Sequence, residues 1–310
     1  MTFSALGSVH EIINPFWFIK ICAQKFRDGY DLLMFSSTFV GIAGMGMVYT
    51  SCFIQGIPAT PEIFILLFLV AFSVYNLNRK SDEEEDAINR QGRYAFTKRN
   101  ERTLFIAAIG AYIVAGSLAL LHGLDTLLVV VIPLLFGVLY SIPCIPWHSS
   151  HRRFKDIPVV KNCIVGSGWA ICLTLLPITI YHGVYSMKTV ITFLFFFSYA
   201  FIASIIPDIR DRVGDEHAGV RTIPVILGEE RTRKILMGIN LTLGCIILVY
   251  SLQMFSRIII GIFLVGTIYT QSCISLFHTM RSKDIVTDVL ADGQFIFFTM
   301  AICILKSLSP

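Results

Sequence analysis

Acidic side chains gather at two places in this otherwise apolar chain, and the first place follows directly on the hydrophobic run IFILLFLVAFSVY. In the segment NLNRKSDEEED, residues 76–86, Asn78, Asp82 and Asp86 recur at every fourth position. On a helix this spacing puts the three side chains on one face. The glutamates between the two aspartates are expected to face solvent.

The second acidic cluster lies in the segment IIPDIRDRVGDEHAGVRTIPVILG, residues 205–228. Asp208 precedes Asp211 by three positions, and Asp211 precedes Asp215 by four. These three side chains can also share one helix face. Both clusters follow the end of an apolar run and are expected on the same side of the membrane, so that two acidic faces can close on one cavity.

Clusters of carboxylates such as these favour the binding of a cation. Carboxylates packed together repel each other and tend to hold protons unless a cation neutralises them. Oxygen ligands select hard cations, and Mg²⁺ takes one or two carboxylates together with phosphate oxygens of a substrate. The two clusters therefore predict a cradle for Mg²⁺ and a diphosphate, with neighbouring basic side chains taking the remaining phosphate charge. For either cluster alone, a solvated helix end is the alternative interpretation.

The elements that carry these clusters are expected to be membrane-spanning helices. The 310 residues are 55% hydrophobic and 15% charged, with a mean hydropathy of +0.71, whereas soluble domains have about 25% charged residues. In lipid the backbone must satisfy its own hydrogen bonds, which favours helices of about 20 apolar residues. The sequence therefore predicts an all-α polytopic protein with nine spans: 32–54, 60–76, 103–122, 125–145, 158–182, 188–207, 234–252, 257–277 and 286–308.

Basic side chains predict the orientation of these spans. The loops that follow even-numbered spans hold most of the Lys and Arg residues, whereas the other side holds only Lys188, Arg257 and Lys306. By the positive-inside rule, the N-terminus and the basic loops are cytoplasmic and the C-terminus lies on the opposite side. We expect one domain over residues 1–310, in which residues 1–30 form a cytoplasmic interfacial segment.

Composition and motifs argue against several other classes. The net charge of +4 reflects this topology, so no nucleic-acid partner is expected. The eight cysteines form no CxxC pair and predict neither a disulfide scaffold nor a zinc site. A transporter would carry ionisable residues along a path at mid-membrane, whereas these acids lie at one rim. The motif of CDP-alcohol phosphotransferases is absent.

Together the segments resemble the UbiA superfamily of intramembrane prenyltransferases. NRKSDEEED is similar to the NxxxDxxxD motif of that family, and DIRDRVGD is similar to its DxxDxxxD motif. The flanking segments DAINRQGR, GDEHAGVRTIPVILG and LYSIP also look like family sequences. The expected number of spans fits as well, so the resemblance covers nearly the whole chain.

The resemblance implies nine helices around a central cavity, with a cytoplasmic cap of loop helices. Two Mg²⁺ ions would bridge an isoprenyl diphosphate donor to the two motifs. Loss of diphosphate would leave an allylic cation, which a lipophilic or aromatic acceptor attacks. Metal and basic side chains stabilise the charge on the leaving group, and an apolar chamber shields the cation from water. Besides donor, acceptor and lipid bilayer, no obligate protein partner is expected.

The family motifs also imply metal ligands at matching positions. The first metal would be held by Asn78, Asp82 and Asp86. The second would be held by Asp211 and Asp215, with Asp208 as a direct or outer ligand.

Four further side chains are implied around the reacting groups. Arg93 would pair with diphosphate oxygens, and Tyr140 would face the reacting carbon. Lys155 or Lys161 would supply the basic residue of the loop between spans four and five. Each has a plain interfacial alternative, in which the arginine and lysines extend to the membrane surface and the tyrosine belongs to an aromatic belt.

Two questions stay open at this level. Terpene cyclases of the same superfamily also begin with Mg²⁺-assisted loss of diphosphate, so the motifs do not separate transfer from cyclisation. The acceptor is equally open among a quinone-precursor aromatic acid, a prenylated glycerol phosphate, a tetrapyrrole and a carotenoid.

Overall fold

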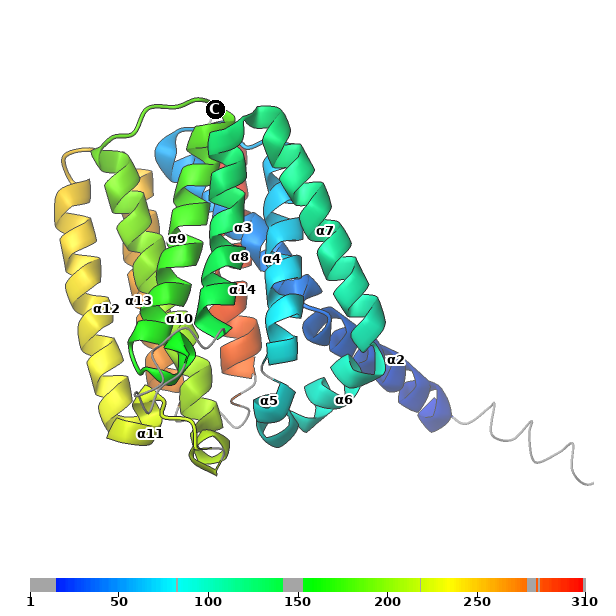
Figure 1. Ribbon diagram of the computed structural model, residues 1–310. Helices are drawn as coiled ribbons and strands as arrows, with labels where there is room; N and C mark the ends of the chain where they lie inside the picture. The colour runs from blue at the N-terminus through cyan, green and yellow to red at the C-terminus, as the bar shows by residue number, and fades with distance from the viewer. Residues whose placement is uncertain are drawn as a thin grey trace, which may run out of the picture.

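The computed structural model describes residues 15–81, 83–141, 153–217, 219–277, 283 and 285–308, and every regular element in these ranges is helical. Long helices stand side by side as a bundle, with short helices across one end (Figure 1). The C-terminus lies at the opposite end of the bundle from these short helices. The predicted all-α membrane fold is confirmed.

Eight helices of the described ranges have the length and hydropathy needed to cross a membrane. They are α3 Thr38–Gln55, α4 Pro61–Ser81, α7 Glu101–His122, α9 Val160–Ile180, α10 Met187–His217, α12 Glu229–Ser251, α13 Arg257–Leu276, and the π-helix η2 Ile285–Ala291 continued by α14 Asp292–Leu308. The apolar helix α8 Leu124–Ser141 is shorter. Each of the nine predicted spans therefore coincides with an apolar helix.

The first span begins later than predicted. Residues 32–35 belong to α2, Pro15–Phe35, which projects away from the bundle at the end with the short helices (Figure 1). The break falls at Ser37, whose φ of 65° is left-handed. The Ser36 and Thr38 hydroxyls lie 2.7 Å apart across this break, and Asn76 Nδ2 donates to the Ser36 carbonyl at 2.9 Å. These side-chain contacts replace the backbone bonds of a continuous helix.

The sixth span is longer than predicted, because α10 runs ten residues beyond position 207. Pro207 removes one backbone hydrogen bond, yet membrane helices tolerate such residues where neighbouring helices surround them. α9 comes close enough that a Cβ at Gly166 would lie 3.2 Å from the backbone nitrogen of Phe201 on α10. The whole second acidic cluster therefore sits on a rigid extension of α10.

The first acidic segment is divided between two helices. Asn78 lies on α4, which ends at Ser81, whereas Asp86 lies on α5, Glu83–Asn89. Because Asp82 lies outside the described residues, the single helix face shared by all three side chains stays a prediction. After α5, α6 Gln91–Arg99 leads back to α7, and both short helices run across the lower end of the bundle in Figure 1.

Ion pairs explain where the acidic segment turns. Lys98 pairs with Glu83, and Lys155 Nζ lies 3.0 Å from Glu85 Oε1. The prediction that these glutamates face solvent is wrong for Glu85, which is partly buried against Lys155, whereas the pair of Glu83 with Lys98 lies at the exposed surface. The side chain of Glu84 lies outside the described residues.

Candidate active site

A cavity of about 270 Å³ opens where α5 and α6 meet the ends of α4, α8, α9 and the last span. One side of its lining is apolar and includes Val74, Phe136 and Ile164. The other side is polar and comprises Asn78, Arg79, Asp86, Arg90, Arg93, Asp288 and Asp292. The cavity thus has an ionic side, toward the short helices, and an apolar side, farther from the short helices.

The first acidic segment contributes Asn78 and Asp86 to this cavity from separate helices. Asp86 is 7% exposed and forms an ion pair with Arg93 of α6. Asn78 lies against α8, where a Cβ at Gly137 would come 3.0 Å from Asn78 Oδ1. Asp82, the middle residue of the predicted motif, lies outside the described residues.

The three aspartates of α10 are each paired, and none is among the described residues that line this cavity. Lys161 Nζ lies 2.7 Å from Asp208 Oδ2. Arg210 forms two hydrogen bonds of 2.7 Å with Asp211. Asp215 is 7% exposed and accepts a hydrogen bond of 2.9 Å from Asn89 Nδ2 of α5.

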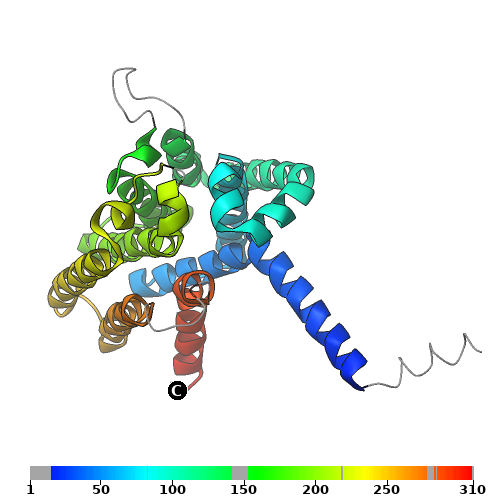
Figure 2. The same cartoon turned by 90° about the horizontal axis from the view of Figure 1, so that it is seen from below.

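The contact between Asn89 and Asp215 joins the two acidic segments. A Cβ built at Gly214 would lie 1.6 Å from Asn89 Oδ1, so a larger residue there would displace the Asn89 amide. Figure 2 shows the cyan α5 region facing the yellow-green end of α10 across the lower end of the molecule. The two clusters predicted to close on one site are therefore neighbours.

Asp288 of η2 makes a second connection between the region of α5 and the end of α10. Arg90, between α5 and α6, donates to its two carboxylate oxygens at 2.5 and 3.2 Å. Arg210 of α10 donates to Asp288 Oδ1 at 3.1 Å and to the Thr287 hydroxyl at 2.7 Å. One partly buried carboxylate on the last span thus holds an arginine that follows the first acidic segment and an arginine of the second, which fixes both regions to the bundle.

Each of the two candidate lysines contacts an acidic segment, although neither is among the described residues that line the cavity. Lys161 is 8% exposed on the first turn of α9 and reaches the second cluster through Asp208. Lys155 is 6% exposed on the short helix η1, Phe154–Asp156, and reaches the first cluster through Glu85. The side chain of Tyr140, at the end of α8, lies outside the described residues.

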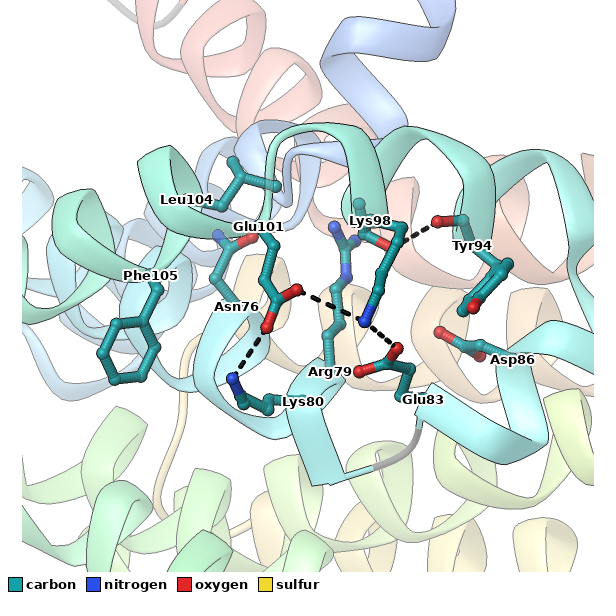
Figure 3. A pocket seen from close by; sticks show the side chains of 11 residues that line it. Asn76, Arg79, Lys80, Glu83, Asp86, Tyr94, Lys98, Glu101, Leu104 and Phe105 are labelled. Atoms are coloured by element: carbon teal, nitrogen blue, oxygen red, sulfur yellow. Dashed lines mark hydrogen bonds and ion pairs between the residues drawn. The ribbon is translucent and has the colours of Figure 1, made fainter.

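A smaller pocket of about 40 Å³ lies between the first acidic segment and α7 (Figure 3). Lys98 pairs there with Glu83 and with Glu101, and Lys80 Nζ lies 2.7 Å from Glu101 Oε1. Hydrogen bonds to Glu83 and Glu101 raise the pKa of the Lys98 ammonium. Asp86 borders this pocket and the larger cavity alike, so the network holds the helix that carries it.

Behind the ionic side of the large cavity lies an apolar chamber of about 80 Å³ between α3, α4, α9, α10 and α14. It is lined mainly by hydrocarbon, including Met47, Leu67 and Leu173. Tyr75 and Trp169 border both spaces, and their rings stack with centroids 5.8 Å apart. The two spaces therefore adjoin at an aromatic pair.

The described residues hold no group of three or more Asp, Glu, His or Cys side chains close enough to bind a metal ion together. Asp86, Asp208, Asp211 and Asp288 are instead paired with basic side chains, and Asp215 accepts a hydrogen bond from an amide. The donor atoms themselves are carboxylate and amide oxygens, which suit Mg²⁺ and not a softer metal. The chemistry of the donor set therefore fits a hard divalent cation.

Five residues of the site were missed at the sequence level, namely Arg79, Arg90, Arg210, Asp288 and Asp292. The two aspartates are four positions apart near the start of the last apolar run. Ionisable residues within a span are expensive in lipid and mark functional sites, so this spacing was an available signal.

Comparisons with known proteins give a consistent picture. A family model, the UbiA prenyltransferase family, matches residues 33–298. The structure of a UbiA homologue from Archaeoglobus fulgidus bound to GPP and Mg²⁺ is similar, with a TM-score of 0.65 and 17% identity over 88% of this chain and 98% of that chain.

Two further structures share the fold. The apo UbiA homologue from Aeropyrum pernix K1 has a TM-score of 0.64 and 13% identity over 85% of this chain and 98% of that chain. A structure described for digeranylgeranylglyceryl phosphate synthase in membranes has a TM-score of 0.54 and 20% identity over 89% and 95% of the two chains. A search of curated protein sequences finds no match.

Proposed function

The chain belongs to the UbiA prenyltransferase family, and from this premise we propose that it transfers an isoprenyl group from an isoprenyl diphosphate to a lipophilic or aromatic acceptor inside the membrane, releasing diphosphate. It is a multi-pass integral membrane protein and an enzyme of the prenyltransferase type. The single observation that carries the proposal is the paired cavity, which is ionic at the short helices and apolar behind them.

The donor has the same two-part character as this cavity. Its diphosphate would bind among the arginines of the ionic side, where Arg90 and Arg93 offer charge-assisted hydrogen bonds. Its hydrocarbon chain would extend into the chamber between α3, α9 and α10. Similar structures with GPP or DMAPP bound support a donor of this class.

Divalent metal is part of the proposal, and we assign two Mg²⁺ ions. The first would be held by Asn78, Asp82 and Asp86, and the second by Asp211 and Asp215 with Asp208 nearby. Bound there, the ions supply positive charge to the leaving diphosphate. The structures of homologues with Mg²⁺ or Cd²⁺ support use of a divalent metal.

The basic partners of the aspartates take part in binding the donor. Arg93 and Lys161 neutralise Asp86 and Asp208 in the protein alone. With Asp86 and Asp208 serving as metal ligands, the Arg93 guanidinium and the Lys161 ammonium would be available to phosphate oxygens. Lys161 therefore has a role in the site, and Lys155, paired with Glu85, holds the first acidic segment in place.

The reaction needs positive charge near the leaving diphosphate. It also needs a chamber that keeps water away from the reacting carbon. The C–O bond of the donor breaks with its electron pair going to the diphosphate, and the allylic carbon is left with positive charge. Tyr75 and Trp169 present aromatic faces beside the point where the two spaces adjoin, and such faces stabilise cations. The apolar chamber excludes the water that would quench the cation.

We also propose that the end of the bundle with α5, α6 and α11, Ile223–Leu227, faces the cytoplasm. These helices and the acidic segments lie at one end in Figure 1, and the C-terminus lies at the other. The basic loops gather at the same end as α5 and α6, which supports this orientation.

The test is incubation of the purified protein with radiolabelled geranyl diphosphate and Mg²⁺, with and without a lipid extract of the source cells. Transfer predicts a labelled lipid and free diphosphate only when the extract is present. A labelled cyclic hydrocarbon without the extract would identify a cyclase instead. Donor that stays intact under both conditions would contradict the proposed function.

A further inference from the structure

Asp292 lies where the two cavities of the site meet. It is the first residue of α14 and borders both the 270 Å³ cavity and the apolar chamber. Five residues are shared by the two linings: Val40, Tyr75, Val165, Trp169 and Asp292. Four of them are apolar or aromatic, so a single carboxylate stands at the junction.

Asp292 differs from the other site aspartates in having no partner. No hydrogen bond or ion pair joins it to another residue in the described part of the chain, whereas Asp288, one turn earlier, is held by Arg90 and Arg210. An isolated carboxylate inside a span is expensive, and such residues are retained for function. Its oxygens are therefore available to a bound molecule.

The backbone ahead of Asp292 is fixed by unusual contacts. The seven residues of η2 form a π-helix, a rare conformation that often occurs at functional sites. Tyr269 Oη donates to the Leu290 carbonyl at 3.0 Å, and Tyr199 Oη donates to the Ala291 carbonyl at 2.6 Å. Two tyrosines from neighbouring spans thus hold the turn that aims Asp292 at the junction.

The chemistry of the carboxylate limits what it can bind. An ionised carboxylate accepts hydrogen bonds or binds a cation, and the two cations of the proposed function are assigned to the acidic segments, so the partner of Asp292 must carry a donor group. The diphosphate is an anion and would be repelled, and the isoprenyl chain has no donor. If the diphosphate lies on the ionic side and the chain in the chamber, the allylic carbon lies at the junction, beside Asp292. The remaining reactant is the acceptor.

We propose, resting on the proposed function, that Asp292 binds the hydroxyl group of an alcohol or phenol acceptor and takes its proton as the acceptor bonds to the allylic carbon. The C–O bond to diphosphate breaks and its electron pair leaves with the diphosphate. The acceptor O–H bond breaks, the proton passes to the Asp292 carboxylate, and the oxygen that lost the proton forms the new bond to the allylic carbon. The acceptor is thereby restricted to a hydroxyl-bearing lipid or aromatic compound.

The test compares Asp292→Asn with Asp288→Asn, a matched change one helical turn away. Two quantities are measured: binding of geranyl diphosphate with Mg²⁺, and the rate at which its radiolabel enters the lipid extract across a range of pH. Removal of a general base costs about 10²–10⁴-fold in rate. Asp292→Asn is expected to bind the donor as the wild type does and to lose this factor. Asp288→Asn is expected to weaken donor binding, because Arg90 and Arg210 lose their shared anchor.

The pH dependence separates proton transfer from simple positioning. In Asp292→Asn only acceptor that is already ionised in solution reacts, so its rate is expected to rise in proportion to hydroxide concentration. Asp292→Glu keeps the carboxylate and is expected to retain the pH profile of the wild type at a lower rate. This second variant also covers the case in which the asparagine variant fails to fold.

Three results would overturn the proposal. Incorporation by Asp292→Asn at the wild-type rate would exclude a base at this position. Weaker donor or Mg²⁺ binding by Asp292→Asn would make Asp292 a metal or donor ligand instead. An equal loss at every pH in both Asp292 variants would indicate a structural role. Failure of the wild-type protein to bind or cleave the donor would instead refute the proposed function on which the inference rests.

Discussion

Replacing Lys161 by Met separates the structural and the functional roles of the lysine at the second acidic cluster. The change keeps the apolar stem and removes the ammonium, which lies 2.7 Å from Asp208 Oδ2. The two side chains are only 10% and 14% exposed, so the carboxylate is left nearly buried without its partner. Removing one member of a buried pair costs about 3–5 kcal/mol, and the residual exposure favours the lower end, about 3 kcal/mol.

The double variant Lys161→Met/Asp208→Asn distinguishes the two roles. It removes both charges, so most of the lost stability is expected to return, and the coupling energy follows from the double-mutant cycle. Donor binding is expected to stay weak in the single and double variants alike, because neither has the ammonium for a phosphate oxygen. Thermal unfolding in detergent measures stability, and titration with geranyl diphosphate and Mg²⁺ measures binding.

Two outcomes would refute this reasoning. A single variant as stable as the wild type would mean that the ion pair is not buried. Wild-type donor affinity in the double variant would mean that Lys161 does not reach the diphosphate, and Lys155 would then be the better candidate.

Three further predictions concern the metal, the helix contact and the π-helix. Excess EDTA should abolish incorporation of labelled donor, and Asp215→Ala should lower it by about 10²–10³-fold, since each lost electrostatic stabiliser costs that much; full turnover in EDTA would contradict metal dependence. Gly214→Ala should displace the Asn89 amide from Asp215, because the added Cβ would lie 1.6 Å from Asn89 Oδ1, and should cost about 1–3 kcal/mol in thermal unfolding. Gly238→Ala, which meets nothing within 4 Å, is the control and should be neutral; equal effects would refute the contact. Tyr199→Phe should cost about 1 kcal/mol and slow incorporation without weakening donor binding, and an unchanged rate would argue against its positioning role.

The fold class was predictable because hydropathy and the length of a membrane span are local properties. Within the described residues, each of the nine apolar runs coincides with an apolar helix. The ends of the helices were less predictable. Contacts made by Ser36 and Asn76 determine the break near Ser37, and packing around Pro207 allows α10 to continue. These contacts come from other parts of the chain and leave no periodic signal.

The composition and spacing of the sequence by themselves determined a helical membrane protein with two acidic segments at one rim. Only the tertiary structure decided which charges are paired and which are free. Asn89 and Asp215 are 126 positions apart, and Arg90 and Asp288 are 198 apart, so no local pattern encodes either contact. For the same reason Asp288 and Asp292 look equivalent in the sequence. The packing of α10, η2 and α14 gives Asp288 two arginine partners. The same packing leaves Asp292 facing the junction of the two cavities.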